Sequence, residues 1–193
     1  QFNFSGGFDY NRTFGDKHDV YSQLKWEYEY RDSYGLNTTI YRQNVSWFTH
    51  YGYDKRYFLD LALVGSGSSL LAPGHKWAFS PTVSAAWVLS EEYFMNNAAW
   101  IDFLKLRASW GKLGNDHIAA SDGFNSISTG NKFSGVFGNT TIPGYENSNY
   151  FSWLKWEVVE EWNAGFNLIA LDNRLNVDID YFHRMTNNAV ISP

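Results

Sequence analysis

One stretch of the chain, LKLRASWGKLGND at residues 104–116, limits the possible folds more than any other. Successive side chains of a strand point to opposite faces of a sheet. As a strand, the stretch has one apolar face and one cationic face, which consist of Leu104, Leu106, Ala108 and Trp110 and of Lys105, Arg107 and Ser109. Two environments suit it: a soluble β-sandwich with a dry core, or a membrane barrel with lipid on one side and water on the other. The stretch by itself leaves both open.

The same alternation recurs along most of the chain and predicts an all-β fold with about eight antiparallel strands. The runs that carry it are 2–14, 18–31, 45–53, 56–64, 80–89, 104–110, 157–170 and 174–184. Many runs last about ten residues, longer than the roughly five or six of globular strands and close to the roughly 9–11 that cross a bilayer. Strand length therefore favours a transmembrane β-barrel.

The amino-acid composition supports a membrane barrel and argues against several other classes of function. Aromatic residues make up 19% of the chain, and several precede turn-like clusters, where outer-membrane barrels have aromatic girdles. The formal charge of −5, with scattered Lys and Arg, provides no basic surface, so nucleic acid is not an expected partner. Because the 193 residues contain no Cys, disulfides and Cys-ligated metal centres are excluded within them.

The connections between the runs are of two kinds. LDNRL at 171–175 and YDKRY at 53–57 are short hairpin turns, whereas the loops at 65–75 and 111–150 are long. Outer-membrane barrels have short turns on one rim and long loops on the other, so we expect residues 111–150 to lie outside the cell. The sequence starts at Gln1 without a signal-peptide pattern and ends just after a strand-like run. We therefore expect residues 1–193 to be a piece of a longer barrel.

Few residues suggest chemistry. Adjacent Glu160 and Glu161 point to opposite sides of a strand and make a poor acid–base pair, and the five His show no metal-ligand spacing. Asp178 and Asp180 share a strand face and suit a bound cation, but hydrated wall explains them better. Six aromatic residues assigned to loops are candidates for stacking on cargo, although packing within the loops is the simpler role: Trp77, Phe133, Phe137, Tyr145, Tyr150 and Phe151. We expect no catalytic, cofactor or metal site.

Several sequence blocks occur in a specific order. They are TFGDKHDV (13–20), GSGSS (65–69), KWAFSPTVSAAWVLSEEYF (76–94), LKLRASWGKLGND (104–116) and LKWEVVEEWNAGFNLIALDNRLNVDIDYF (154–182). In this order they resemble the C-terminal barrel of SusC/RagA-type TonB-dependent transporters of the Bacteroidetes outer membrane, over nearly the whole chain. Two places depart from the family pattern: residues 64–69 stand where the family often has Arg-x-Asp-Gly-Ser-Ser, and residues 79–81 where it often has Phe-Pro-Ser.

The resemblance implies a plugged barrel of about 22 strands in the outer membrane of a Gram-negative bacterium. Residues 1–193 would supply about eight of these strands and neither the plug nor the TonB box. The resemblance further implies import of oligosaccharides or oligopeptides with a SusD-like surface lipoprotein as lid, energy from TonB, and a dimer of transporter–lid pairs in outer-membrane lipid.

A membrane-embedded wall also places four charged residues toward the lumen: Lys105, Arg107, Asp178 and Asp180. The alternative is a secreted β-sandwich module that binds glycans, in which two sheets would pack over a dry core.

Overall fold

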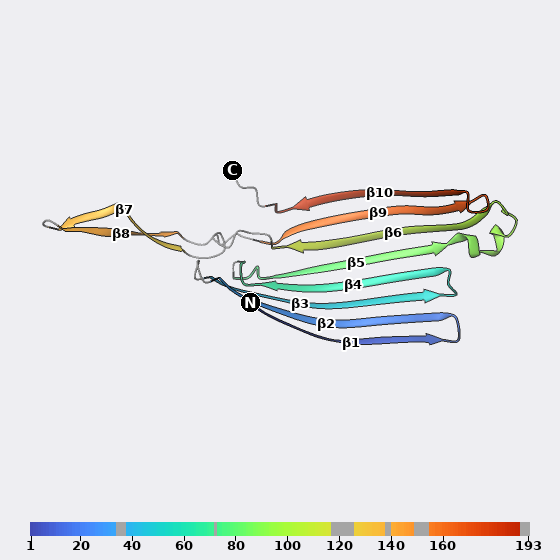
Figure 1. Ribbon diagram of the computed structural model, residues 1–193, viewed down its shortest axis with the longest axis horizontal. Coiled ribbons are helices and arrows are strands. Elements are labelled where there is room, and N and C mark those ends of the chain that lie inside the picture. Colours follow the sequence, from blue (N-terminus) through green and yellow to red (C-terminus); the bar gives the residue numbers. More distant parts are fainter. Residues whose placement is uncertain (34–37, 72, 117–125, 138–139, 149–154, 190–193) are drawn as a thin grey trace.

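The computed structural model describes residues 1–33, 38–71, 73–116, 126–137, 140–148 and 155–189. Eight strands form one antiparallel sheet in the order β1-β2-β3-β4-β5-β6-β9-β10, and β7 pairs with β8 in a separate hairpin (Figure 1). The strands are β1 Phe2–Phe14, β2 His18–Ser33, β3 Thr38–Tyr53, β4 Tyr57–Ser68, β5 Trp77–Val88, β6 Ile101–Asn115, β7 Ser126–Phe137, β8 Thr140–Ser148, β9 Glu157–Ala170 and β10 Leu175–Asn187. Two short 3-10 turns, η1 Leu89–Glu91 and η2 Tyr93–Met95, precede β6.

The two ends of the sheet differ in how the strands are joined (Figure 1). At the short-turn end, tight turns at 15–17, 54–56 and 171–174 join β1 to β2, β3 to β4 and β9 to β10, and residues 89–100 join β5 to β6. The turn residues Asp54, Lys55 and Asp172 have positive φ of 52°, 57° and 55°, as two-residue hairpin turns require to match the twist of the strands. At the opposite, long-loop end, the β7–β8 hairpin projects beyond the sheet.

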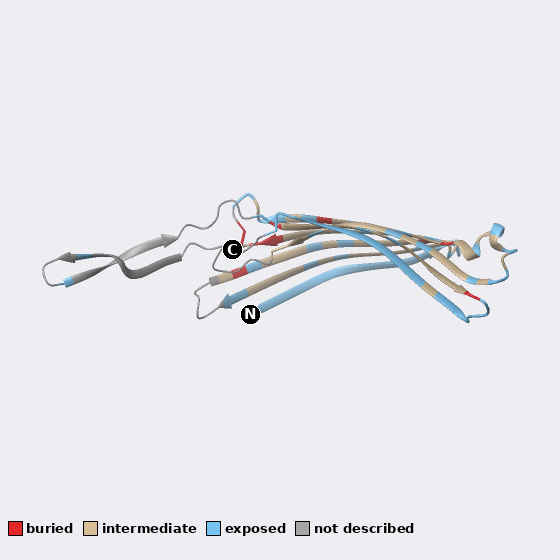
Figure 2. Cartoon of the chain, turned by 90° about the horizontal axis from the view of Figure 1, so that it is seen from above, coloured by how far each residue is buried: buried red, intermediate tan, exposed pale blue. Residues whose placement is uncertain are grey.

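The sheet is a single curved layer (Figure 2). The buried hydrophobic residues among those described lie near its two ends: Ile40, Leu70, Leu71 and Trp156 at the long-loop end, Val88 and Ala170 at the short-turn end. Large hydrophobic side chains are exposed on every one of the eight paired strands. An apolar surface of this extent marks an interaction with lipid or protein. No helix in the described ranges is long and apolar enough to cross a membrane.

The sequence prediction of one all-β antiparallel sheet with about eight strands is confirmed. The predicted alternative of a β-sandwich is wrong for this chain, because the eight strands form one sheet rather than two sheets packed over a core. The strands are longer than the pattern suggested: β3 starts at Thr38 rather than near residue 45, and β6 runs to Asn115.

Two predicted loops also contain strand residues. Residues 65–68 continue β4 and pair with β3 and β5, and Trp77 begins β5 instead of lying in a loop. The predicted loop 111–150 contains the end of β6 and the β7–β8 hairpin. Gly and Ser disfavour strands by themselves, but pairing on both sides overrides that preference. At Gly67 the absence of a side chain also has a use, because a Cβ there would lie 3.2 Å from the Trp77 ring.

β5 and β6 separate toward the long-loop end. They pair only over residues 82–88 of β5 and 105–111 of β6, although β5 begins at Trp77 and β6 ends at Asn115. Across the separation, the Gly114 amide donates a hydrogen bond to Ser80 Oγ at 3.0 Å. This side-chain contact joins β5 and β6 near the long-loop end, where their backbones do not pair.

Candidate functional site

The register divides the sheet into two faces, because directly paired residues lie on the same side. The row through Leu106 has an aromatic or aliphatic side chain on each of the eight strands: Phe14, His18, Tyr53, Tyr57, Trp87, Leu106, Phe166 and Ile179. The row through Arg107 consists of Thr13, Asp19, Gly52, Phe58, Ala86, Arg107, Gly165 and Asp180. We call the side with Leu106 the apolar face and the side with Arg107 the polar face.

Arg107 is the centre of a charged cluster on the polar face. Its guanidinium donates to Asp180 from Nε at 3.1 Å and from Nη2 at 2.6 Å, which is the strong two-point geometry for this pair. It also donates to Asp178 Oδ1 and to Asn167 Oδ1, each at 2.6 Å. The side chains of Arg107, Asp178 and Asp180 are 32%, 56% and 43% exposed, so water screens the pairs. The cluster is therefore a hydrated part of the wall, with two carboxylates for one guanidinium.

Arg107 reaches across a whole strand because the residue between it and Asp180 is Gly165. Arg107 on β6 pairs with Gly165 on β9, and Gly165 pairs with Asp180 on β10. A Cβ at Gly165 would collide with Asp180 Oδ1 and would lie 2.6 Å from the carbonyl oxygen of Ile179. The missing side chain thus opens a path over β9 for the ion pair.

A second polar row crosses β3, β4 and β5 on the same face. Asp60 lies 2.5 Å from His50 Nδ1 and accepts a hydrogen bond from Ser84 Oγ at 3.0 Å. A nucleophilic Ser needs a base within hydrogen-bond reach, but here the hydroxyl donates to the carboxylate and not to the imidazole. Phe58 stacks on His50 with 5.9 Å between ring centroids, and Lys105 Nζ lies 5.8 Å from the Phe58 centroid. The row fits a polar wall rather than a catalytic triad.

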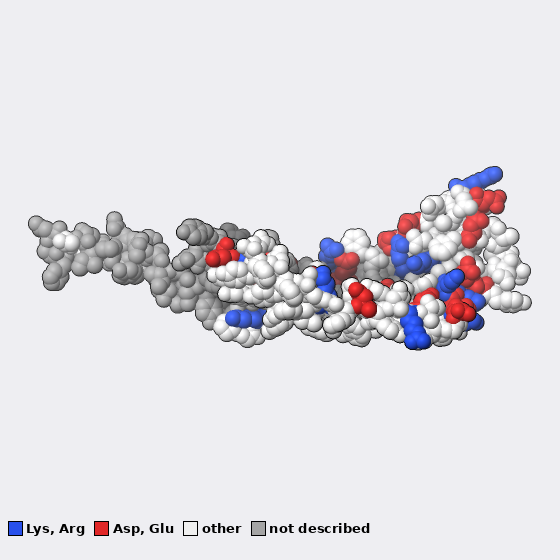
Figure 3. All heavy atoms as spheres, turned by 60° about the horizontal axis from the view of Figure 1, so that its bottom comes forward, with Lys and Arg blue, Asp and Glu red and all other residues white. Residues whose placement is uncertain are grey.

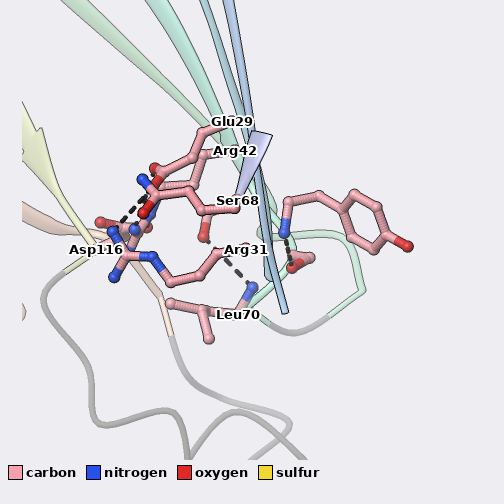
Figure 4. A network of polar contacts seen from close by, with 9 residues as sticks. Glu29, Arg31, Arg42, Ser68, Leu70 and Asp116 are labelled. Atoms are coloured by element: carbon pink, nitrogen blue, oxygen red, sulfur yellow. Dashed lines mark hydrogen bonds and ion pairs between the residues drawn. The ribbon is translucent and has the colours of Figure 1, made fainter. Parts of the chain in front are cut away.

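On the polar face, a network of ion pairs holds the start of the long connection after β6 against β2 and β3 (Figure 4). Arg42 Nε donates to Asp116 Oδ2 at 2.7 Å, and Arg42 Nη1 lies 3.5 Å from Glu29 Oε2. Arg31 pairs with the same Glu29 at 2.9 Å. These side chains tie β2 and β3 to the end of β6, across two strands of the sheet. The start of the 116–156 connection is therefore fixed by charge.

Charged side chains of both signs stand next to one another instead of forming separate blocks (Figure 3). Glu161, for example, pairs with Arg184 at 2.5 Å, and Lys112 Nζ lies 3.5 Å from Glu160 Oε2. Within the described residues, no group of three or more His, Cys, Asp or Glu has the arrangement to hold a metal ion. Charges of opposite sign therefore neighbour one another on the surface of the described part of the chain.

The apolar face has aromatic rings toward both ends. At the long-loop end Phe4 packs on Trp26 and Tyr30 on Tyr41, with ring centroids 5.5 Å and 5.3 Å apart. At the short-turn end a series of rings runs along the row through Leu106. Two bands of aromatic rings that flank an apolar middle are typical of outer-membrane barrel strands.

Two hydroxyl groups on the apolar face, those of Ser22 and Thr49, are paired with each other. Ser22 Oγ lies 3.0 Å from Thr49 Oγ1 and accepts a hydrogen bond from Trp47 Nε1 at 3.0 Å. A polar group that faces hydrocarbon must find a partner within the protein, because lipid offers none. Ser22, Thr49 and Trp47 therefore have the internal partners that contact with lipid demands.

Trp156 fills the separation between β5 and β6. It is 8% exposed and packs with Leu71 and Ala78. Gly114 makes room for it, since a Cβ there would lie 2.8 Å from Ala78 Cβ and 3.2 Å from the Trp156 ring. Trp77, one of the aromatic residues predicted to stack on cargo, borders the same hollow and is 58% exposed.

The other predicted site residues fall in different places. Lys105, Arg107, Asp178 and Asp180 share the polar face, as the parity of the sequence predicted, and their position toward a lumen stays a prediction. Three of the aromatic residues lie on the β7–β8 hairpin rather than in loops: Phe133, Phe137 and Tyr145. The remaining two, Tyr150 and Phe151, lie outside the described residues.

Sequence reasoning missed several polar partners that the turns could have located. The turn at 171–174 fixes the β9–β10 register, and counting back from it pairs Asn167 with Asp178. The turn at 54–56 likewise pairs His50 with Asp60. The contact between Arg42 and Asp116 had no such signal, because it joins residues 74 positions apart.

Comparison with known proteins finds no matching family model. The chain is 30% identical over 210 residues to TonB-dependent receptor P39 of Formosa agariphila, a match that covers 94% of this chain and 20% of that protein. It is 27% identical over 188 residues to TonB-dependent receptor SusC of Bacteroides thetaiotaomicron, covering 92% of this chain and 18% of that protein. The chain thus spans about one fifth of the length of these curated relatives.

The solved structures that it resembles are those of a larger barrel. The RagAB peptide transporter matches with a TM-score of 0.81 and 20% identity, over 98% of this chain and 24% of that one. The RagAB peptide importer in its open-open state matches with a TM-score of 0.82 and 20% identity, over 98% of this chain and 23% of that one. At this identity the likeness establishes a shared fold, in which the sheet corresponds to part of a barrel wall.

Proposed function

Since this chain is a segment of a SusC/RagA-type TonB-dependent transporter, we propose that it forms part of an outer-membrane barrel that imports oligosaccharides or oligopeptides. One observation carries the proposal: one face of a single sheet has the apolar row through Leu106, and the opposite face has the charged cluster around Arg107. A wall between lipid and a water-filled lumen needs both faces.

The free edges of the sheet support a larger barrel. β1 and β10 each have one unpaired side, and both strands are 13 residues long. Long unpaired edges promote aggregation in water and are not tolerated in lipid, where each backbone group needs a partner. In the proposal, further strands of the same protein pair with β1 and β10 and close a barrel of about 22 strands around a plug.

The polar face suits hydrophilic cargo of either kind. The clusters around Arg107 and Asp60 offer donors and acceptors in water, and neighbouring charges of opposite sign leave no strong single-sign field. RagAB is a peptide transporter by name, so peptides stand beside glycans as candidate cargo. A SusD-like surface lipoprotein would cover the long-loop end, from which the β7–β8 hairpin projects. TonB would supply energy through a plug outside residues 1–193.

The experiment uses the full-length protein in its own bacterium. Deletion of its gene should abolish growth on, or uptake of, one class of labelled oligosaccharide or oligopeptide, and the intact gene should restore it. Affinity purification from outer membranes should recover a surface lipoprotein with the barrel. A full-length protein that fractionates with soluble proteins, or a deletion that changes no uptake among both cargo classes, would contradict the proposal.

A further inference from the structure

The β5–β6 connection differs from the other connections at the short-turn end. The tight turns contain charged residues: Asp16 and Lys17, Asp54 to Arg56, and Asp172 and Arg174. The β5–β6 connection begins with Glu91 and Glu92, but the nine residues that follow, YFMNNAAWI at 93–101, contain no charged residue. A connection that projects into water has no physical reason to avoid charge, whereas a connection that enters a membrane interface does.

The uncharged stretch 93–101 of this connection exposes large rings. Tyr93, Phe94 and Trp100 are 87%, 62% and 57% exposed. Three large rings at such exposures on one short connection give it an apolar surface of the kind that marks an interaction site. Asn96 and Asn97, also exposed, give the same segment polar groups at short intervals. This mixture of apolar rings and polar tips is enriched at membrane–water interfaces.

The patch continues the apolar face of the sheet. Ring contacts run from His18 to Tyr53, from Tyr53 to Tyr57 and from Tyr57 to Trp87, with centroids 4.9, 6.2 and 6.1 Å apart. Phe94 then meets the edge of Trp87 at 6.5 Å. The connection therefore extends the aromatic band of that face beyond the ends of the strands.

Glu92 fastens the connection to the sheet. Its Oε1 accepts hydrogen bonds from the Tyr57 hydroxyl at 2.5 Å and from Trp87 Nε1 at 3.0 Å, and its Oε2 lies 3.5 Å from Arg56. On the other side of the rings, the Leu171 amide donates to the carbonyl of Trp100 at 2.9 Å. Both ends of the uncharged segment are thus held, so its rings have a defined height relative to the strands.

We propose that residues 93–100 are an interfacial anchor, with Tyr93, Phe94 and Trp100 in the phospholipid headgroup layer at the short-turn end. The anchor rests on the proposed membrane-embedded wall and adds a lipid contact beyond its strands. Lipid is the occupant because the patch is continuous with the lipid-facing rings. The free edges at β1 and β10, where further strands would pair, lie elsewhere, since β5 and β6 are interior strands of the sheet.

The test places single nitroxide labels on the full-length protein in vesicles of phosphatidylethanolamine and phosphatidylglycerol without other proteins. Ala99→Cys reports the connection and leaves its rings intact, and the 193 residues contain no other Cys. Leu106→Cys is the reference for lipid, and Asp172→Cys, on an exposed turn at the same end, is the reference for water. Oxygen favours lipid and a nickel chelate favours water, so the ratio of their collision rates gives the depth of each label.

The anchor predicts a ratio at residue 99 between those of residues 106 and 172. Replacing two of the three rings, with Tyr93→Ser and Phe94→Ser, should shift the ratio at residue 99 toward that of residue 172 and leave residue 106 unchanged. If residue 99 matches residue 172 while residue 106 lies in lipid, the anchor is wrong and the membrane wall stands. If residue 106 also matches residue 172, the membrane wall fails as well. A label at residue 99 that lies in water in vesicles but is shielded in native outer membranes would assign the patch to a protein partner and overturn the lipid anchor.

Discussion

Leu106 and Arg107 are neighbours in the sequence, yet their side chains lie on opposite faces of the sheet, one apolar and one polar. On the Leu106 side, eight paired strands present rings and aliphatic chains, and the Ser22 hydroxyl is satisfied within the protein. On the Arg107 side, carboxylates, a guanidinium and an amide meet while they remain partly exposed. The difference indicates that each strand is adapted to an apolar environment on one face and to water on the other, rather than to a packed protein core. Mutations that make the same change on the apolar face and on the polar face test this directly.

The largest effect is expected from a charge placed on the apolar face. Ala108 and Ser109 are adjacent small residues at the middle of β6, on the apolar and the polar face. Ala108→Arg should cost about 2–4 kcal/mol if the site lies near the bilayer midplane, because a guanidinium must leave water. Ser109→Arg, the matched control, should assemble normally. Heat-modifiable gel migration of the full-length protein in outer membranes measures assembly, and equal behaviour of the two variants would break the division into faces.

A smaller effect is expected from a side chain at Gly165. Gly165→Val should force Asp180 and the β10 backbone to move, at a cost of about 1–3 kcal/mol by analogy with other overpacked sites. Ala164→Val, its neighbour on the apolar face, faces the opposite side and should change stability by much less. The midpoint of urea unfolding in detergent or vesicles compares them. Similar midpoints for the two variants would mean that the passage over β9 does not depend on glycine.

The ion pair that uses this passage should contribute less. Because Arg107 and Asp180 are partly exposed, their coupling energy should be about 1 kcal/mol or less. A double-mutant cycle with Arg107→Met and Asp180→Asn measures the coupling as a shift in the urea midpoint, and added salt should reduce it. A coupling of several kcal/mol that salt leaves unchanged would show that the ion pair is shielded from water, and would contradict the description of the polar face as hydrated.

Much of this division could be predicted from the sequence, because it depends on local rules. Alternation gives the face of each residue within a strand, and it assigned Asp178 and Asp180 to one face of their own strand. A hairpin turn gives the register with the next strand, and this information, which was not used, would have paired Asn167 with Asp178. The end of β4 at residues 65–68 was missed, since Gly and Ser form a strand there only by pairing with neighbours on both sides.

Contacts between distant segments had no local signal. The packing of Trp156 in the separation between β5 and β6 depends on where those strands stop pairing, which no alternation records. Tyr93 and Phe94 were read only as the end of a family motif and Trp100 was not singled out, because the exposure of these rings depends on the way Glu92 holds the segment against β4 and β5. The sequence thus predicted faces and turns, and the structure was needed for everything that joins three or more elements.

The smallest expected effect concerns Glu92, at the border where the apolar face meets water. Hydrogen bonds from Tyr57 and Trp87, followed by the charge of Arg56, hold the pKa of Glu92 below its ordinary value, although burial acts to raise it. A carboxyl group with a lowered pKa in the folded state contributes stability above its unfolded pKa, about 4.3 for Glu, and loses it as the pH falls through the folded pKa.

The connection should therefore be fixed at neutral pH and loosen only in acid. A nitroxide at Ala99 should gain mobility as the pH is lowered below the ordinary pKa of Glu, whereas Glu92→Gln should show raised mobility with little dependence on pH. A label at Asp172 provides the control, because it lies on a different turn at the same end. Loosening of both labels together would indicate general acid unfolding, and an unchanged label at residue 99 in Glu92→Gln would show that the rings hold the connection without the carboxylate.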